Sequence, residues 1–178
     1  GKESCPAMYK SFYQNLLTLE DTRIRLERYT ENAILDKKSF ELLEREYLLS
    51  EIRYWLLARR TKDLCENDVV TILNFYSPPK DCPHCEAQGF ILSYLKKLFD
   101  DKLLIFSFNT RYDKEPLIPM LEATYNVTEY PSLVVEDTTY TGFTSKNDLL
   151  RAVCSHFTEP TPGCAEYQLG LLEENGAD

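Results

Sequence analysis

The chain has 178 residues and a formal net charge of −9 at pH 7, which argues against a nucleic-acid partner and against binding to anionic membrane surfaces. Its composition, 43% hydrophobic and 28% charged, is ordinary for a globular protein that buries one good core with a helical annex. No run of about 18 apolar residues occurs, so no segment of the sequence is expected to span a membrane. The Gly1-Lys2 start suggests a mature chain from which a leader or anchor has been removed.

The first part of the chain predicts two long helices. Residues 6 to about 31 carry apolar side chains at helical spacing, and a second helix follows from about 38 to 64, with Asp36 or Ser39 as its N-cap. The second helix has apolar residues on more than one face, which predicts that it is covered both by its hairpin partner and by the following domain. Two helices of similar length joined by a short loop predict an antiparallel hairpin over residues 1–67.

From residue 69 the pattern changes to alternating strands and helices. The apolar run 69–76 predicts a buried strand, ended by Pro78 and Pro79. The elements expected after it are a helix at 83–100, a strand at 103–108, a helix at 114–125, strands at 132–135 and 139–142, and a helix from 145 to about 157. This β-α-β-α-β-β-α order predicts an α/β domain over residues 68–157, with one mixed sheet and helices on both faces.

The motif Cys82-Pro83-His84-Cys85 stands between the first predicted strand and the helix after it. Two cysteines at this spacing on a first helical turn can form a disulfide, and the free N–H groups and the dipole of the helix stabilise a thiolate. Cys82 is therefore expected to be the exposed, attacking thiol and Cys85 the buried partner that resolves a mixed disulfide. Pro83 suits a first-turn position, and a protonated His84 would favour the thiolate further.

Three other interpretations of the motif compete with this one. A zinc site would need a second Cys-x-x-Cys or a spaced His pair, which the sequence lacks. Haem attachment would need His directly after the second cysteine, where Glu86 stands. A purely structural disulfide within one helical turn is the third and rarer alternative. We therefore expect neither a metal ion nor a cofactor.

The strand leading into the Cys-x-x-Cys helix, together with Tyr130-Pro131-Ser132-Leu133 before the third strand, resembles the thioredoxin superfamily over about residues 69–157. Within that superfamily, Cys-Pro-His-Cys is similar to the motif of bacterial Dsb-type thiol oxidases, and the Tyr-Pro stretch to protein disulfide isomerase domains. The resemblance implies a cis Pro131 that faces the dithiol. It also implies that the backbone of Tyr130 pairs with an extended substrate segment.

The sequence departs from the pattern of this family in several places. Asn74 stands where related domains carry a buried Asp or Glu, and an amide cannot take up a proton from Cys85. Asp81 directly precedes Cys82 and opposes a thiolate there, while Lys80 is a candidate to offset its charge. The helical hairpin stands in place of the family's optional leading strand-helix unit.

Four cysteines lie outside the motif. An even number of further cysteines in a small acidic chain suggests that they pair in disulfides, which indicates an oxidising compartment. An antiparallel hairpin brings its open ends together, so a Cys5–Cys65 disulfide is the preferred pairing, against the alternative of two independent buried thiols. A disulfide between Cys154 and Cys164 would then link the tail, residues 158–178, to the last helix. A short helix is expected in this tail at 165–174.

These patterns predict an extracytoplasmic thiol-disulfide oxidoreductase that exchanges the Cys82–Cys85 disulfide with protein thiols, as an oxidase or isomerase rather than a reductase. The expected partners are protein thiol or disulfide substrates and a membrane redox partner. The expected location is the periplasm or cell envelope, where a longer form could carry a membrane anchor, with the endoplasmic reticulum lumen as the alternative. The alternative function is a thioredoxin-fold interaction or dimerisation module that acts through the hairpin, its dithiol being structural or vestigial.

Overall fold

The computed structural model describes residues 2–32 and 36–165, which divide into two compact units at the boundary between Asn67 and Asp68. Each unit is described by itself. The predicted tail helix at 165–174 lies, beyond Ala165, outside the described residues. In the part of the chain that the structure describes, no helix combines the length and the apolar character needed to cross a bilayer.

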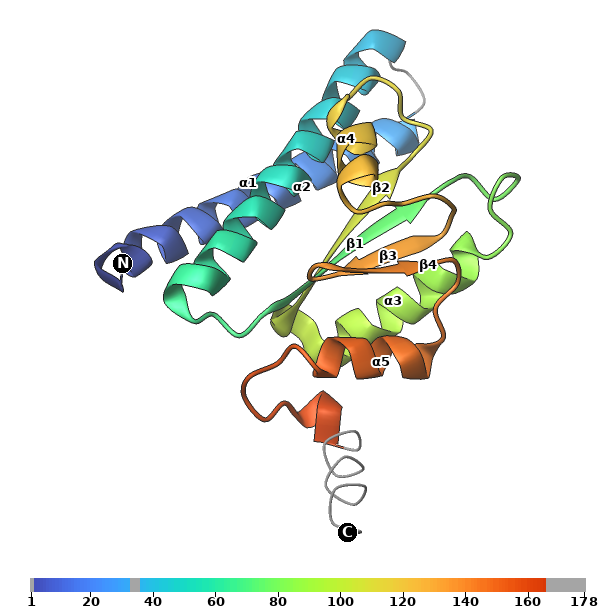
Figure 1. The fold of residues 1–178 in the computed structure, drawn as a ribbon. Helices are drawn as coiled ribbons and strands as arrows, with labels where there is room; N and C mark the ends of the chain where they lie inside the picture. Colours follow the sequence, from blue (N-terminus) through green and yellow to red (C-terminus); the bar gives the residue numbers. More distant parts are fainter. Residues whose placement is uncertain (1, 33–35, 166–178) are drawn as a thin grey trace. The chain divides into compact units, whose positions relative to one another are not determined.

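The first unit is a helical hairpin (Figure 1). After a short 3-10 turn, η1 (Lys2–Ser4), helix α1 (Cys5–Asn32) packs against α2 (Lys37–Cys65). Of the two predicted N-caps for α2, Asp36 is the one used: its side chain accepts a hydrogen bond from the N–H of Lys38 at 3.3 Å. Contacts along the hairpin include the Phe12 and Tyr54 rings, with centroids 4.7 Å apart.

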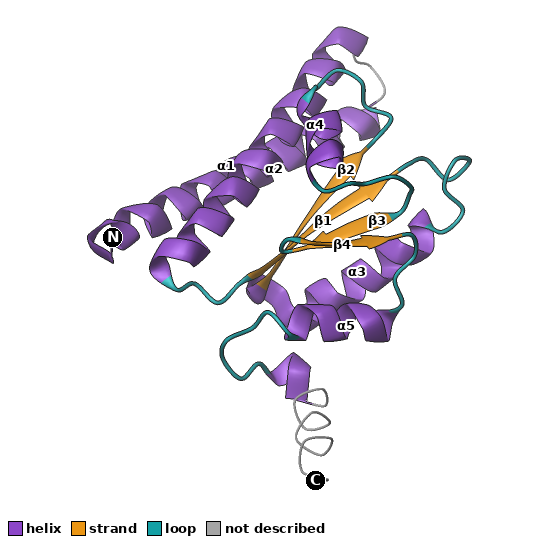
Figure 2. Ribbon diagram, in the orientation of Figure 1, coloured by secondary structure: helices purple, strands orange, loops and turns teal. Residues whose placement is uncertain are grey.

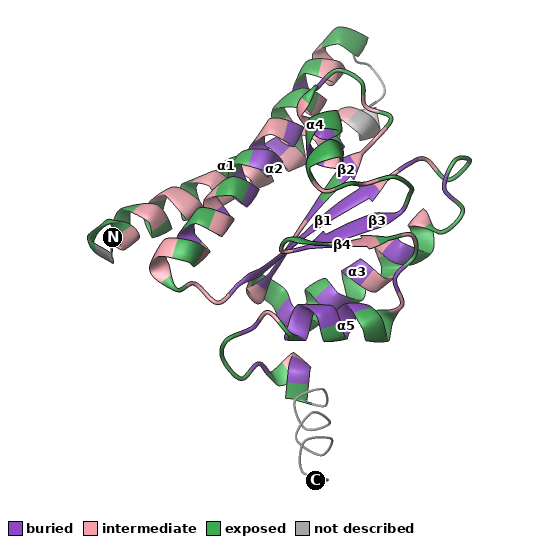
Figure 3. Cartoon of the chain, viewed as in Figure 1, coloured by how far each residue is buried: buried purple, intermediate pink, exposed green. Residues whose placement is uncertain are grey.

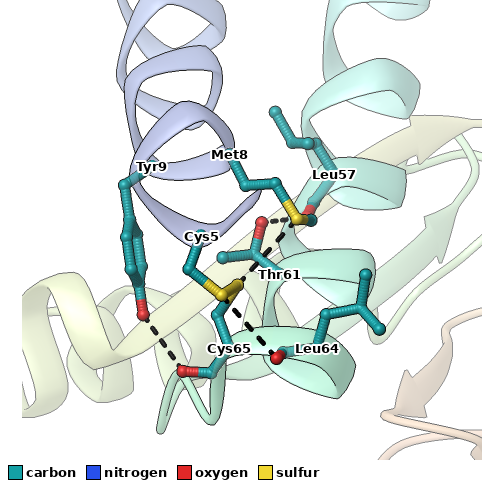
Figure 4. The surroundings of a disulfide bond; sticks show 7 residues. All are labelled: Cys5, Met8, Tyr9, Leu57, Thr61, Leu64 and Cys65. Atoms are coloured by element: carbon teal, nitrogen blue, oxygen red, sulfur yellow. Dashed lines mark hydrogen bonds between the residues drawn. A yellow bond between two sulfur atoms is a disulfide. The ribbon is translucent and has the colours of Figure 1, made fainter. Parts of the chain in front are cut away.

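A disulfide closes the open end of the hairpin between Cys5 and Cys65, whose Cα atoms lie 5.7 Å apart (Figure 4). The Tyr9 hydroxyl donates to the carbonyl oxygen of Cys65 at 3.2 Å, and Met8 Sδ lies 3.9 Å from Cys65 Sγ. Cys5 Sγ lies 3.7 Å from the carbonyl oxygen of Leu64. The first turn of α1 and the last turn of α2 are therefore held together by a covalent bond and by a tyrosine that reaches across.

The second unit is built on a four-stranded mixed sheet in the order β2-β1-β3-β4. The strands are β1 (Val70–Tyr76), β2 (Leu103–Asn109), β3 (Ser132–Val135) and β4 (Thr138–Thr141). β1 runs parallel to β2 and antiparallel to β3, and β3 and β4 form an antiparallel hairpin. β1 is buried over nearly its whole length, which is the pattern of a central strand in a sheet covered on both faces (Figure 3).

Helices α3 (Cys85–Phe99) and α5 (Lys146–Cys154) lie on one face of the sheet, and α4 (Leu117–Thr124) lies on the other (Figure 2). The main core lies between the sheet and the α3–α5 layer. Its fully buried members include Val70, Ile72, Leu95, Leu103, Leu133, Val135, Leu149 and Val153. The order of elements and the strand directions are those of the predicted thioredoxin-like α/β fold, preceded by a helical hairpin.

Three helix boundaries in this unit differ from the predicted ones. α3 begins at Cys85 rather than at residue 83, because the residues before it form separate turns. α4 begins at Leu117 rather than at 114, with Pro116 as its N-cap residue. α5 starts after Ser145, whose Oγ accepts from the N–H of Asp148 at 3.2 Å, as predicted, but it ends at Cys154 rather than at about 157.

The segment after α5 is tied back to the rest of the second unit. Cys154 and Cys164 form a disulfide with a Cα–Cα distance of 5.6 Å, which is the pairing preferred from the sequence. Gly163 packs so closely on the end of α3 that a Cβ there would lie 2.6 Å from Phe99 Cε1. Asp68 accepts hydrogen bonds from the N–H of Thr158 at 2.9 Å and from its hydroxyl at 3.0 Å. The connector after α5 is therefore fixed at both of its ends.

Candidate active site

The Cys-x-x-Cys motif lies in the loop that leaves the C-terminal end of β1, and its two cysteines form a disulfide with a Cα–Cα distance of 5.5 Å. Two successive turns make up this loop. The N–H of Asp81 donates to the carbonyl of Pro78 at 2.9 Å, and the N–H of Cys85 donates to the carbonyl of Cys82 at 3.3 Å. Cys85 is consequently the first residue of α3, whereas Cys82 belongs to the turn before the helix.

The predicted order of exposure of the two cysteines is wrong. Cys82, expected to be the exposed thiol, is 1% exposed, and Cys85, expected to be buried, is only half-buried. The physical reason is the length of the loop. The N–H of Cys82 pairs with the carbonyl of Pro79 at 3.4 Å, which folds Cys82 inward and delays the start of the helix to Cys85.

The N-terminus of α3 is open to a negatively charged ligand or thiolate. Its N-cap residue, His84, makes no side-chain capping hydrogen bond, so the first-turn N–H groups have no acceptor from it. His84 is exposed, and its ring lies 6.0 Å from the ring of Phe143, centroid to centroid. Cys85 is the first residue of the helix, and a thiolate released at this helix end would be stabilised by the helix dipole.

The carboxylate of Asp81 is neutralised by a residue that sequence reasoning missed. Arg111 Nη2 lies 3.1 Å from Asp81 Oδ2, so this ion pair, rather than the expected contact with Lys80, offsets the negative charge beside Cys82. Arg111 follows β2, far from the motif in sequence, and no local pattern links the two residues. The parallel pairing of β1 with β2 brings the segments after both strands to the same end of the sheet.

Pro131 immediately precedes β3, and the Tyr130–Pro131 peptide bond is cis. Because Ser132 pairs with Phe75 near the end of β1, Pro131 lies at the end of the sheet from which the motif loop leaves. The Tyr130 hydroxyl donates a hydrogen bond to Glu122. Burial raises the pKa of Tyr130, the bond to Glu122 raises it further, and Thr110 opposes both effects without reversing them.

Asn74, on β1, is buried beneath α3, and only part of its side-chain amide is hydrogen-bonded. Its Nδ2 donates to Ser107 Oγ on the neighbouring strand β2 at 3.1 Å, while its Oδ1 has no hydrogen-bond partner among the described residues. The same side chains line a cleft of about 480 Å³, together with Gly89 and Ser93 of α3. Gly89, Ser93 and Lys97 line this cleft on successive turns, so Asn74 faces α3 beyond its first turn.

A second buried amide, Gln88, was missed by sequence reasoning. It is fully buried, donates through Nε2 to the carbonyl of Thr144 at 3.3 Å and accepts from the N–H of Thr144 at 2.8 Å. The signal that could have found it is spacing: Gln88, Leu92 and Leu95 fall on one helical face, so a polar residue stands on the buried stripe. This pair joins the first turns of α3 to the loop between β4 and α5.

Within residues 2–32 and 36–165, no group of three or more His, Cys, Asp or Glu residues is arranged so that it could hold a metal ion. The two motif sulfurs lie at the N-terminus of α3, with polar side chains around them.

The sequence matches no family model, and no curated protein matches it. Similar solved structures include the germline-specific thioredoxin Deadhead from Drosophila melanogaster, 16% identical, which covers 53% of this chain and 87% of its own with a TM-score of 0.38. The J-Trx1 fragment of ERdj5 is 21% identical and covers 88% of this chain and 93% of its own with a TM-score of 0.39.

A third similar structure contains the first two thioredoxin domains of Naumovozyma dairenensis Eps1p, 17% identical, covering 51% of this chain and 36% of its own with a TM-score of 0.37. At such TM-scores these similarities carry no inference about function. From its own strand order, strand directions and motif position, the chain has a thioredoxin-like fold, the fold type of thiol-disulfide oxidoreductases, preceded by a helical hairpin.

Proposed function

We propose that the protein is an extracytoplasmic thiol-disulfide oxidoreductase that exchanges its Cys82–Cys85 disulfide with the thiols of other proteins. The observation that carries the proposal is the position of this disulfide, at a helix N-terminus whose N-cap residue makes no side-chain hydrogen bond. A thiolate released there is stabilised by the helix dipole, which makes the cysteine both a better leaving group and a more abundant nucleophile at neutral pH.

The reaction consists of two exchange steps. A substrate thiolate attacks one motif sulfur, a substrate–protein disulfide forms, the Cys82–Cys85 bond breaks, and its electron pair stays on the other motif sulfur as a thiolate. A second substrate thiolate then attacks the mixed disulfide at the substrate sulfur. The substrate leaves as a disulfide, and the motif leaves as a dithiol that has gained two electrons. A membrane redox partner would accept those electrons and restore the motif disulfide.

Oxidase or isomerase activity is favoured over reductase activity, and the other disulfides support this direction. Cys5–Cys65 and Cys154–Cys164 are both bridged, so all six cysteines of the chain are paired. Disulfides of this kind persist in oxidising compartments. We propose that the protein works in the periplasm or cell envelope, with the endoplasmic reticulum lumen as the alternative.

The test is a set of glutathione buffers of stepped redox potential, in which each cysteine is followed by thiol labelling and mass spectrometry. A Cys82–Cys85 couple that titrates near about −120 mV, as in strong oxidants, supports a disulfide donor, and one near about −270 mV indicates a reductase. In parallel, the protein is added to a reduced, unfolded secreted protein whose folding needs disulfides. The Cys82→Ser/Cys85→Ser double variant is the matched control. Wild-type protein that oxidises this substrate no faster than the double variant would contradict the proposal.

A second candidate function is an interaction or dimerisation module that acts through the hairpin, and one observation favours it. The exposed large apolar residues of α1 fall at helical spacing: Tyr9, Tyr13, Leu17 and Ile24. Light scattering on the wild type and on a Tyr13→Glu/Leu17→Glu variant tests this function, with Thr18→Glu as an exposed control on the same helix. If light scattering gives the molar mass of a single chain for all three proteins, the result argues against self-association.

A further inference from the structure

We infer that the cleft between β2 and α3 binds a small phenolic acid, a molecule with an aromatic ring, a hydroxyl group at its inner end and a carboxylate at its outer end. The cleft has a volume of about 480 Å³, which is within the range of small-molecule sites in proteins. Neither motif cysteine lines it, and its first residue on α3 is Gly89. The inference goes beyond the proposed function and does not rest on it.

Gly89 leaves open a space that a side chain would fill. It stands inside α3, where a glycine weakens the helix relative to alanine. Its φ is not among the positive values of the chain, and a Cβ on it would meet no described atom within 4 Å beyond its own stretch of helix. Neither the backbone nor the packing therefore requires glycine here. What the glycine provides is room, because this wall of the cleft stays flat and open to a ring.

Apolar side chains form much of the lining. Leu92 of α3 is buried, and Ile105 of β2 packs against the main core while it also lines the cleft. Lys96 lines the cleft too, but its Nζ already donates to the carbonyls of Asp100 at 2.6 Å and Leu103 at 2.8 Å. Apolar walls with a few polar groups are typical of small-molecule sites, and they favour a ligand whose body is a hydrocarbon ring.

Asn74 supplies the polar contact at the inner end of the cleft. It is more than nine-tenths buried, and its Oδ1 has no hydrogen-bond partner among the described residues, while its Nδ2 donates to Ser107 Oγ. A buried polar atom without a partner is costly, so a ligand that completes the hydrogen bonding of this amide gains affinity. Half a turn of the side chain exchanges the oxygen and the nitrogen of the amide. A hydroxyl group can pair with either of them, because it both donates and accepts.

Lys97 supplies a positive charge at the other end of the cleft. Its neighbour Lys96 reaches Leu103 at the start of β2, whereas Asn74 bonds to Ser107 near the end of that strand. Lys97 therefore lies towards the end of the cleft opposite to Asn74. It is exposed, and within residues 2–32 and 36–165 it makes no ion pair. A carboxylate on the outer end of the ring is the group that pairs with this ammonium.

The first experiment titrates the isotope-labelled full chain with para-hydroxyphenylacetate and follows its NMR spectrum. We expect saturable shifts of the backbone signals of Gly89 and Ser93 and of the side-chain amide of Asn74. Phenylacetate, which lacks the hydroxyl, should bind about tenfold more weakly, because the buried amide then stays without its partner. Para-hydroxyphenylethanol, which lacks the carboxylate, should bind about threefold more weakly at low salt. Equal binding of phenylacetate, or shifts that do not saturate up to about 10 mM probe, would overturn the inference.

The second experiment changes the cleft itself. Gly89→Leu fills the open space with a better helix former, so it should fold, as circular dichroism can verify, and bind the probe about tenfold more weakly or less. Ala87→Leu, at an exposed position of α3, is the matched control and should bind normally. A folded Gly89→Leu variant that binds the probe as tightly as the wild type rejects the site.

A charge variant keeps the test decisive if Gly89→Leu does not fold. Lys97→Gln should weaken para-hydroxyphenylacetate about threefold and leave para-hydroxyphenylethanol unchanged, because only the first carries the carboxylate. Lys80→Gln, at an exposed lysine of the motif loop, should change neither. The same affinity of Lys97→Gln and of the wild type for para-hydroxyphenylacetate contradicts the inference.

The inference and the proposed function fail separately. The Cys82→Ser/Cys85→Ser variant should bind the probe as the wild type does, because neither cysteine lines the cleft. A loss of binding in this variant would place the probe at the motif and overturn the inference. If the wild type binds the probe but oxidises no protein substrate, the proposed function fails and the site stands. If it oxidises the substrate but does not bind the probe, only the inference fails.

Discussion

The side-chain amide of Asn74 donates to the hydroxyl of Ser107 across the paired strands β1 and β2, at 3.1 Å, and leaves its own oxygen without a partner among the described residues. Asn74 is 8% exposed and lines the cleft that runs along α3 from Gly89 to Lys97. The buried Asn74 and its exposed partner Ser107 are both neutral, and neither changes charge between acid and neutral pH.

Replacing Asn74 by Asp should make the stability of the protein depend on pH. Burial raises the pKa of the new carboxyl in the folded state above its unfolded value of about 3.9. The unfolded chain then loses its proton first, so the variant loses stability as the pH rises above about 4, by about 1–3 kcal/mol at neutral pH. Urea unfolding at about pH 4 and about pH 7 measures this. Gln14→Glu, the same chemical change at an exposed position of α1, is the control and should show little effect. Equal destabilisation of Asn74→Asp at both pH values would contradict the prediction.

Replacing Gln88 by Leu should destabilise the protein by about 1–3 kcal/mol. Leu fills a similar volume but leaves the N–H and the carbonyl of Thr144 without their partner, and Thr144 is 7% exposed. Chemical denaturation of the wild type and of the variant gives the difference. Lys97→Leu, on an exposed position of the same helix, provides the comparison. Similar losses for the two variants would show that the Gln88–Thr144 bonds contribute no stability of their own.

Removing each of the two disulfides outside the motif should lower the free energy of unfolding by a different amount. They close 60 and 10 residues of chain, respectively. In the chain-entropy model, Cys5→Ser/Cys65→Ser loses about 4 kcal/mol and Cys154→Ser/Cys164→Ser about 3 kcal/mol. Thermal unfolding followed by far-UV circular dichroism compares the two double variants. A smaller loss for the hairpin variant would mean that packing between α1 and α2 already restricts the unfolded chain.

Replacing Asp68 by Asn should destabilise the protein at neutral pH and destabilise it less in acid. Burial alone would raise the pKa of Asp68, but hydrogen bonds from Thr158 and Glu159 and the charge of Lys102 outweigh it and lower the pKa. The ionised side chain therefore stabilises the fold above the unfolded pKa of about 3.9, and this contribution disappears as the pH falls through the lower folded value. We expect a difference of about 1 kcal/mol at pH 7 that shrinks on acidification.

The measurement for Asp68→Asn is the urea midpoint between about pH 2 and about pH 7. Asp101→Asn, an exposed acid in the turn before β2, serves as the control. A wild-type advantage that grew on acidification would have the wrong sign and would reject the assigned pKa shift.

The sequence was sufficient to predict the elements whose pattern is local. β1 was predictable because its apolar run is continuous, and the end of the hairpin because Cys5 and Cys65 flank two helices of similar length. Asp36 was one of two candidate caps, and the structure uses it.

What the sequence did not predict depends on contacts between residues far apart in the chain. The start of α3 was misplaced because the Pro79–Cys82 hydrogen bond adds a turn that the motif itself does not encode. The exposure of the two cysteines was inverted for the same reason. Arg111 and Thr110 were missed because they reach the motif loop only through the pairing of β1 with β2.

Helix α3 is anchored at the end farthest from the motif. Lys96 Nζ donates to the carbonyls of Asp100 at 2.6 Å and Leu103 at 2.8 Å, and Gly163 packs on Phe99. Because the far end of α3 is held in this way, we expect the opening of the motif disulfide to change only the motif loop and the first turn of the helix. Phe90 is 69% exposed on α3, and we expect the part of the helix that carries it to keep its shape when the disulfide opens. A partner that binds this part of α3 gains no differential affinity for either form, and its release after exchange must be driven by the loop and the first turn alone.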